Sequence, residues 1–281
     1  MNTYQDDCQQ KPLVSVITIN YHNLEGLKRT RASVIEQTFA SMEWIVIDGG
    51  SGDEERTFIE QHQSEMTYWC SEPDGGVYQA MNKGILKAQG KYCIFMNSGD
   101  MFYDSHVLEH VFMENPSADV LYGDWSQSYP DGHRKMMYAP KVFSLHFICT
   151  ENICHQAMFI RSEVMKASPY DEHYLLYADW AKWIELALQG CSFQYVPWTI
   201  CHYEMNGMSQ KQTEKLQEEF KKLQDEAIPP AMKETLSFFT KNRGVATLSR
   251  EVERLSNKKR RYKRMLQNCV GFIHFLEKAG L

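Results

Sequence analysis

Short apolar runs rich in β-branched residues alternate with stretches of helical periodicity, and this alternation limits the possible folds more than any other feature of the sequence. Residues 13–19 and 44–47 are too short for helices and are apolar at consecutive positions, as buried parallel strands are. Between them, apolar residues recur at helical spacing after Asn23, a suitable N-cap. The pattern predicts an α/β domain built on an open sheet.

The same signals continue along the chain and then stop. Further strands are predicted at 92–96, 119–122, 157–160 and 193–200, and further helices at 76–88, 105–113 and 178–188. Strand signals end near residue 208, and Pro229 and Pro230 interrupt the helical region that follows. We therefore expect one domain over residues 1–209 and a helical C-terminal extension over residues 210–281.

Polar residues follow three of the predicted strands, where an open α/β sheet binds its ligands. Asn20 and Tyr21 follow the first strand, and Asp48 follows the second and is itself followed by two glycines. The glycines let the chain turn sharply and let a flat ligand approach, so that Asp48 could accept from a base or from ribose hydroxyls. Alternatively, residues 48–53 form only a turn that caps the next helix, with Asp53 as the cap.

Asp100 closes an Asn-Ser-Gly-Asp turn after the strand at 92–96, a position suited to a hard divalent cation on a diphosphate. Such turns are common and most of them bind nothing. The stretch 71–84 is more specific, because it places Asp74, two glycines and then Asn82 and Lys83 on the expected first turns of a helix. There, donor groups and the positive helix end would face an anion.

With these motifs in order, the chain resembles glycosyltransferase family 2, whose members have the GT-A fold, a Rossmann-like open mixed sheet flanked by helices. The resemblance covers about residues 12–209, through VSVITINYHN, IVIDGGSGD, SEPDGGVYQAMNKGILKAQGKYCIFMNSGD, HQAMFIR, YADWAKWIEL and, more loosely, NGMS. It implies an enzyme that moves a sugar from a nucleotide diphosphate donor to an acceptor hydroxyl with inversion.

The resemblance also implies roles for four acids. Asp48 would recognise the nucleobase, Asp74 would help to hold the nucleoside, and Asp100 would bind a divalent metal, Mn²⁺ or Mg²⁺, on the diphosphate. Asp179 would be the catalytic base. With these roles, the predicted nucleotide-sugar-binding residues are Asn20, Tyr21, Asp48, Asp74, Asn82 and Lys83.

The chain departs from the family pattern at two places. The metal motif has one carboxylate where many relatives have more, and Ala178 replaces the first acid of the pair that ends in Asp179. These departures keep open a catalytically degenerate nucleotide-sugar-binding protein. A nucleotidyltransferase is the other alternative, but Tyr21 and the residues after it do not form the Gly-rich basic loop that such enzymes place after the first strand.

Several side chains near these motifs have two readings. Asp179 lies among large apolar side chains and could be a base, or an N-cap for a helix beginning at Trp180. Without Asp179, His155 or Glu185 would be the next candidate base. His155 and Gln156 precede a strand and could line the acceptor side. His202 could be a further metal ligand or contact the leaving diphosphate, although a lone histidine is more often structural.

Charge and cysteine content limit the partners and the compartment. A formal net charge of −6 argues against a nucleic-acid partner, and the polar first 11 residues resemble no secretory signal. Eight scattered cysteines without CxxC pairs favour reduced thiols and a cytoplasmic protein. The basic, partly apolar segment after Arg250 could bind the inner face of an anionic membrane, or pack on the domain or on a second subunit in a homodimer. The expected acceptor is a glycan or a lipid-linked molecule of bacterial surface polysaccharide assembly.

Overall fold

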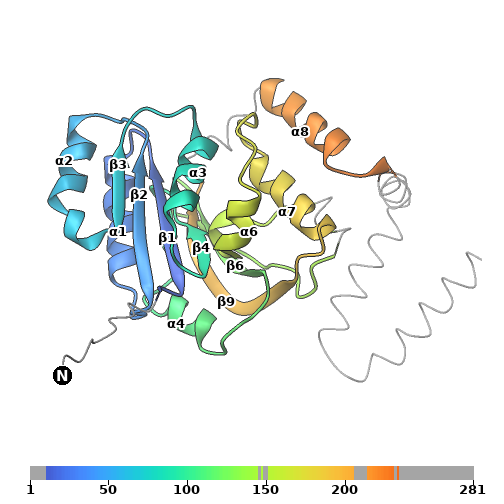
Figure 1. The fold of residues 1–281 in the computed structure, drawn as a ribbon, viewed down its shortest axis with the longest axis horizontal. Helices are drawn as coiled ribbons and strands as arrows, with labels where there is room; N and C mark the ends of the chain where they lie inside the picture. Colours follow the sequence, from blue (N-terminus) through green and yellow to red (C-terminus); the bar gives the residue numbers. More distant parts are fainter. Residues whose placement is uncertain (1–10, 145–146, 148–150, 206–213, 231–232, 234–281) are drawn as a thin grey trace, which may run out of the picture. The chain divides into compact units, whose positions relative to one another are not determined.

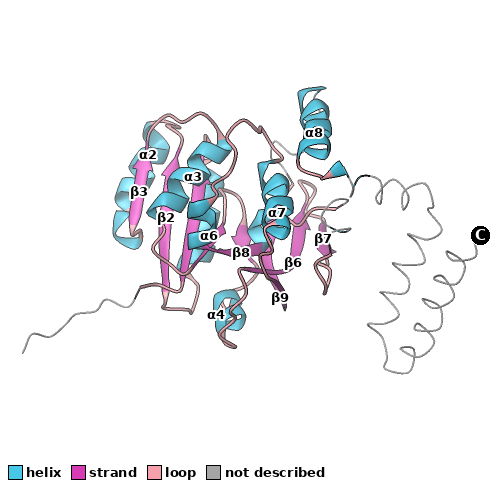
Figure 2. Ribbon diagram, turned by 45° about the vertical axis from the view of Figure 1, so that its right-hand side comes forward, coloured by secondary structure: helices cyan, strands magenta, loops and turns pink. Residues whose placement is uncertain are grey.

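The computed structural model describes residues 11–144, 147, 151–205, 214–230 and 233. Within these residues the core is a nine-stranded mixed sheet flanked by helices (Figures 1 and 2). Across the sheet the strands are β3 (Tyr68–Ser71), β2 (Met42–Asp48), β1 (Val14–Asn20), β4 (Tyr92–Phe95), β8 (Met158–Arg161), β6 (Val120–Ser128), β9 (Phe193–Glu204) and β5 (Met101–Phe102), with β7 (Arg134–Met137) paired to β6.

Helices cover both faces of the sheet. They are α1 (Leu24–Ile35), α2 (Asp53–Gln61), α3 (Val77–Lys87), α4 (Val107–Phe112), α6 (Ser162–Ala167), α7 (Ala178–Leu188) and α8 (Glu214–Glu226), with 3-10 turns η1 (Gln63–Glu65) and η2 (His155–Ala157). This arrangement confirms the expected α/β fold with an open mixed sheet.

The first four strands run parallel, and their chain order places the candidate site. β1 pairs with β2 on one side and with β4 on the other, while β3 pairs with β2. All seven residues of β1 are buried, as expected for a strand covered on both faces. α1 and α2 lie on one face, and α3 and α6 lie on the other (Figure 1). The strand order therefore reverses between β1 and β4, where open α/β sheets bind ligands beyond the carboxyl ends.

One glycine sets how closely α3 approaches this sheet. A Cβ at Gly84 would meet the Cγ2 methyl of Ile17 on β1 closer than any real side-chain contact. Glycine at this position therefore lets the helix backbone lie directly against the strand.

The second half of the sheet is mixed. β8 pairs antiparallel with both β4 and β6, β9 pairs parallel with β6, and the short β5 pairs antiparallel with β9. β8 is thus held on both edges at the centre of the sheet, directly after η2. The strands β3, β5 and β7 and the helix α6 were not predicted from the sequence.

Three helix starts can be compared with the expectations. The Asn23 side chain accepts from the Gly26 amide at 3.0 Å, which confirms it as the N-cap of α1. Helix α3 begins at Val77, one residue after the expected start, so Asn82 and Lys83 lie in its second turn. Gly52, not Asp53, is the N-cap of α2, and Asp53 lies in the first turn of that helix.

Contacts divide the chain into two compact units, residues 1–227 and 228–281. Helix α8, which the sequence analysis placed in the C-terminal extension, belongs to the first unit. The Glu219 carboxylate accepts from the amides of Leu175, Leu176 and Tyr177, each at 2.9 Å. The basic segment after Arg250 lies outside the described residues, and its predicted contact with a membrane or a second subunit stays a prediction.

Two further features concern the described residues alone. None of their helices has the length and apolar character needed to cross a membrane. Five of the eight cysteines fall among these residues, and all five are free thiols: Cys70, Cys93, Cys154, Cys191 and Cys201.

Candidate active site

The Asp48 carboxylate is a hub that ties together the ends of three strands. It accepts from Asn20 Nδ2 at the end of β1 and from Ser71 Oγ at the end of β3, each at 2.7 Å. The Ser51 amide donates at 3.0 Å, and the Ser51 hydroxyl donates as well. Burial raises the pKa of Asp48, but these hydrogen bonds outweigh it and hold the pKa below its ordinary value. Because each oxygen receives two donors and no surface is exposed, the carboxylate is saturated within the protein.

Tyr21 and Asp74 lie together above the glycine that follows Asp48. A Cβ at Gly49 would lie 2.9 Å from Asp74 Oδ2 and 3.2 Å from Tyr21 Cδ2, so this glycine makes room for both side chains. Asp74 Oδ1 accepts from the Gly76 amide at 3.0 Å. The Tyr21 side chain is 67% exposed. An exposed ring beside a carboxylate offers a stacking surface together with a hydrogen-bond acceptor, which suits a nucleoside.

Asn82 and Lys83 make their contacts within the protein. The Asn82 amide group bonds to the amide and carbonyl of Tyr170 and to Glu172, each at 2.9 Å, and thereby holds the loop before α7. Lys83 forms an ion pair of 2.8 Å with Glu72. Donor binding by these two residues stays a prediction, and the observed contacts favour a bracing role for Asn82.

Asp100 is a buried acid in the loop after β4, with 5% of its surface exposed. Oδ2 accepts from Gln156 Nε2 at 2.6 Å, and Oδ1 accepts from the Glu204 amide at 3.0 Å. Burial raises the pKa of Asp100 to about 6, against the effect of these hydrogen bonds. One lone pair on each oxygen remains for another partner.

The structure does not bring His202 to Asp100. Cys201, the neighbour of His202 on β9, lies beside Asp100, and successive strand residues point to opposite faces. The His202 ring packs on Tyr103, with centroids 4.8 Å apart. Across the part of the chain that the structure describes, no three His, Cys, Asp or Glu side chains form a metal cluster. A role of His202 as a metal ligand or at the leaving diphosphate stays a prediction.

Asp179 lies in the first turn of α7 and is joined to the loop after β4 through one imidazole. His155 Nδ1 is 3.2 Å from Asp179 Oδ2, and His155 Nε2 is 2.9 Å from Asn97 Nδ2. Asp179 Oδ1 also accepts from the Trp180 amide at 2.7 Å. The N-cap of α7 is Tyr177, which makes no side-chain cap, so the expectation of an N-cap at Asp179 was wrong by position.

Two residues of this site had no predicted role. Asn97 is part of the NSGD motif. The sequence analysis noted only that this motif has a single carboxylate, and it gave the Asn97 amide no role. The Tyr78 hydroxyl lies 3.5 Å from the Asp179 amide and donates to the Leu176 carbonyl. Glu185, the other candidate for the base, is held by Lys182 on α7 and by Ser168 and Gln189, the residues that directly follow α6 and α7.

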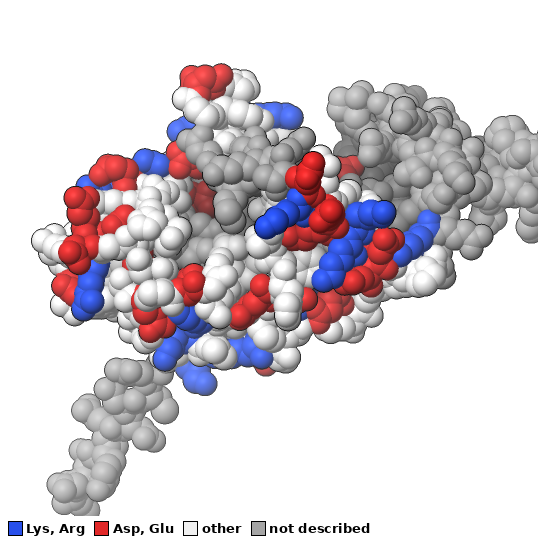
Figure 3. All heavy atoms as spheres, turned by 90° about the horizontal axis from the view of Figure 1, so that it is seen from above, with Lys and Arg blue, Asp and Glu red and all other residues white. Residues whose placement is uncertain are grey.

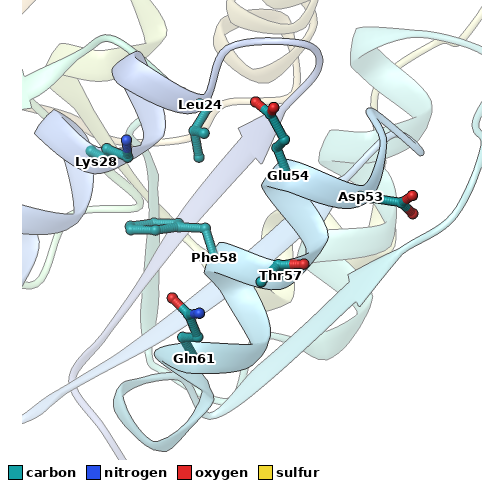
Figure 4. Close-up of a pocket in the computed structure, with 7 residues that line it drawn as sticks. All are labelled: Leu24, Lys28, Asp53, Glu54, Thr57, Phe58 and Gln61. Atoms are coloured by element: carbon teal, nitrogen blue, oxygen red, sulfur yellow. The ribbon is translucent and has the colours of Figure 1, made fainter.

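A groove between α1 and α2 has none of these site residues in its lining. It has a volume of about 400 Å³, and its lining side chains come from those two helices (Figure 4). A smaller cavity of about 220 Å³ lies beside Gly99 and Met101, on the β9 side of the loop after β4. On the face shown in Figure 3, acidic and basic side chains of the described residues are intermingled, without the basic stripe of a nucleic-acid binder.

Comparison with known proteins supports one family. The family model for glycosyl transferase family 2 matches residues 15–166. An uncharacterized glycosyltransferase of Mycobacterium tuberculosis is 35% identical over 206 residues, which is 70% of this chain and 77% of the relative. A PGL/p-HBAD biosynthesis glycosyltransferase of Mycobacterium bovis is 29% identical over 180 residues, 60% of this chain and 67% of that protein.

A solved structure agrees with these sequence relatives on the fold. The crystal structure of S. aureus TarS 1–349 in complex with UDP-GlcNAc matches with a TM-score of 0.60 at 17% identity. The match covers 75% of this chain and 64% of TarS 1–349, so the chain spans less than two thirds of that protein. Taken with the family model and the sequence relatives, these findings show that the chain belongs to glycosyltransferase family 2.

Proposed function

We propose that this protein is an inverting glycosyltransferase that moves a sugar from a nucleotide diphosphate donor to an acceptor hydroxyl. The observation that carries the proposal is the junction of Asp179, His155 and Asn97, at 3.2 and 2.9 Å. It joins a carboxylate suited to act as a base to the loop that presents Asp100. The junction thus places a candidate base and a candidate diphosphate site in one domain, near the point where the strand order of the sheet reverses.

In the proposed reaction, Asp179 takes the proton from the acceptor hydroxyl as that oxygen attacks the anomeric carbon. The bond from the anomeric carbon to the diphosphate oxygen breaks on the opposite side, and the nucleoside diphosphate leaves. A single in-line displacement of this kind inverts the anomeric configuration. Because Asp179 is 8% exposed, most water is kept from the carboxylate.

The donor would lie across the ends of β1, β2 and β4. Tyr21 and Asp74 would hold the nucleoside, by stacking and by hydrogen bonding. Asp48, saturated by Asn20, Ser51 and Ser71, would act by fixing the strand ends under it. The complex of the similar TarS structure with UDP-GlcNAc supports a nucleotide-sugar donor.

A divalent ion fits the residues present only if the donor supplies most of its ligands. Asp100 is a single buried carboxylate with one lone pair left on each oxygen. Mg²⁺ typically binds one or two carboxylates together with substrate phosphates and water. Held by Asp100 and the diphosphate, Mn²⁺ or Mg²⁺ would neutralise the charge that develops on the leaving group.

We further propose that the acceptor is a glycan or lipid-linked molecule of bacterial surface assembly. The relative named for PGL/p-HBAD biosynthesis supports this proposal. A degenerate nucleotide-sugar-binding protein is the second candidate, favoured by the single carboxylate at Asp100.

The test uses the full chain with UDP-, GDP- and dTDP-sugars, with and without Mn²⁺. A true donor at a hundred times its dissociation constant should stabilise the fold by about 2.7 kcal/mol in a thermal-shift assay. Labelled donor and a range of acceptors then report transfer or slow hydrolysis, and NMR of the product reports its anomeric configuration. Binding without any turnover would favour the degenerate protein, and a retained configuration would contradict the mechanism.

A further inference from the structure

Two adjacent side chains of the turn η2 contact the two acids on which the proposed function depends. His155 Nδ1 lies 3.2 Å from Asp179 Oδ2 on α7, and Gln156 Nε2 donates to Asp100 Oδ2 at 2.6 Å in the loop after β4. The two acids come from different elements, and among the described residues no hydrogen bond joins one carboxyl group to the other. A single turn thus stands between them.

The turn itself is firmly held. Gln156 is 2% exposed and Ala157 is fully buried. The next residues form β8, which pairs with β4 on one side and β6 on the other. Because β8 is central in the sheet, η2 is a rigid base for the two side chains.

The contacts of His155 indicate which ring nitrogen carries the proton. With the Asn97 amide oriented as in the structure, Nδ2 faces His155 Nε2 at 2.9 Å, and a neutral ring then accepts at Nε2. The proton of the neutral ring is then on Nδ1, where it donates to Asp179. Both ring nitrogens have partners within the protein. The expectation that His155 and Gln156 line the acceptor side stays a prediction.

We propose that His155 and Gln156 are a pair of positioning residues that fix the base and the diphosphate acid relative to each other. His155 orients Asp179 toward the acceptor oxygen, and Gln156 orients Asp100 toward the leaving group. In-line displacement needs both ends of the reacting system aligned, and a misplacement of about 1 Å costs about a hundredfold in rate. This inference rests on the proposed function, because it assigns the two acids to opposite ends of one reaction.

Two conservative substitutions at His155 separate its two contacts. The amide nitrogen of Asn lies near the position of Nδ1, so His155→Asn keeps a donor to Asp179 and loses Asn97. Gln reaches the position of Nε2, so His155→Gln keeps Asn97 and loses the donor to Asp179. We expect His155→Gln to lower kcat about a hundredfold with the donor KM near that of the wild type. His155→Asn should keep a kcat much closer to that of the wild type.

Gln156→Met keeps the size of the side chain and removes the donor to Asp100. We expect it to raise the donor KM about tenfold, the lower end of what removing such a supporting contact costs.

The matched control for the His155 variants is His173→Asn, since His173 Nδ1 also bonds to an aspartate, Asp171 Oδ1 at 2.8 Å, but its side chain is 88% exposed. This variant should keep wild-type kinetics.

The tautomer of His155 can be measured by NMR on the wild-type protein without substrate, so this part of the test does not depend on whether the variants fold. In wild-type protein labelled with ¹⁵N-histidine, with the His155 signal assigned by its absence from His155→Asn, the imidazole should show the Nδ1–H tautomer. An Nε2–H tautomer would overturn the proposal, as would equal turnover by folded His155→Gln and His155→Asn. Absence of sugar transfer by the wild-type protein with every donor would contradict the proposed function, whereas normal transfer by Asp179→Asn would overturn the part of this proposal that assigns Asp179 as the base.

Discussion

Asp48 and Asp179 are both buried aspartates near the carboxyl ends of the strands, but the structure treats their carboxylates differently. The oxygens of Asp48 receive four hydrogen bonds from three side chains and one amide. Asp179 receives one from His155 and one from the Trp180 amide. The first carboxylate has no lone pair left for a ligand, whereas the second has one on each oxygen.

This difference separates a structural role from a chemical one within one site. Removing the Asp48 charge should loosen the ends of β1, β2 and β3, because each donor around it would lose its acceptor. Removing the Asp179 charge should leave the fold almost unchanged and abolish proton transfer.

The largest expected effect on stability is that of Asp48→Asn. The amide group places donors opposite the Ser51 amide and the hydroxyls, so we expect a loss of about 3 kcal/mol in the free energy of unfolding at pH 7. Because the folded-state pKa of Asp48 is lowered, its stabilisation is present at neutral pH and is lost as the pH falls below about 4. Urea unfolding at both pH values measures this. Asp53→Asn, at an exposed position in the first turn of α2, is the control, and equal stability of the two variants would contradict the structural role of Asp48.

Asp100→Asn should have the opposite sign. With its pKa raised to about 6 by burial, the ionised Asp100 destabilises the metal-free protein. This cost is absent near pH 4, grows as the pH rises toward 6 and is constant above it. In the presence of a chelator we expect the variant to be more stable than wild type by about 2 kcal/mol at pH 7 and equal near pH 4. A constant difference across this range would show that Asp100 does not titrate there.

A smaller effect is expected from Tyr21→Ala, confined to donor binding. The ring is 67% exposed, so its removal should change the melting temperature little. Loss of stacking on a base should weaken donor binding by about 1 to 2 kcal/mol in calorimetry. Tyr21→Phe keeps the ring and should bind as wild type does, so a Phe variant as weak as Ala would point to the hydroxyl instead of stacking.

Much of the fold could be predicted because its signals are local. The buried strands β1, β2 and β4 are consecutive apolar residues, and Asn23 caps the next helix within three residues. β3 and β5 were not predicted, since β3 has only four residues, all half-buried, and β5 has only two residues. Short strands of this kind are defined by their partners in the sheet and not by their own residues.

The candidate site was predictable in its residues but not in its connections. Asp48, Asp100 and Asp179 stood out by motif, whereas their partners come from distant parts of the chain. Gln156 is 56 residues from Asp100, and Asn97 is 58 residues from His155. Such pairings depend on the packing of β8 between β4 and β6, which no local pattern contains.

The most direct test of the central claim is sugar transfer by Asp179→Asn at saturating donor, measured beside its melting curve. Asn keeps the size of the side chain and an oxygen that can accept from Trp180, and it removes the capacity to take a proton. We expect donor binding to persist, stability to fall by about 1 kcal/mol because the new amide nitrogen faces His155 Nδ1, and turnover to fall by about a hundredfold or more. Turnover near that of wild type in a folded Asp179→Asn protein would contradict the assignment of Asp179 as the base.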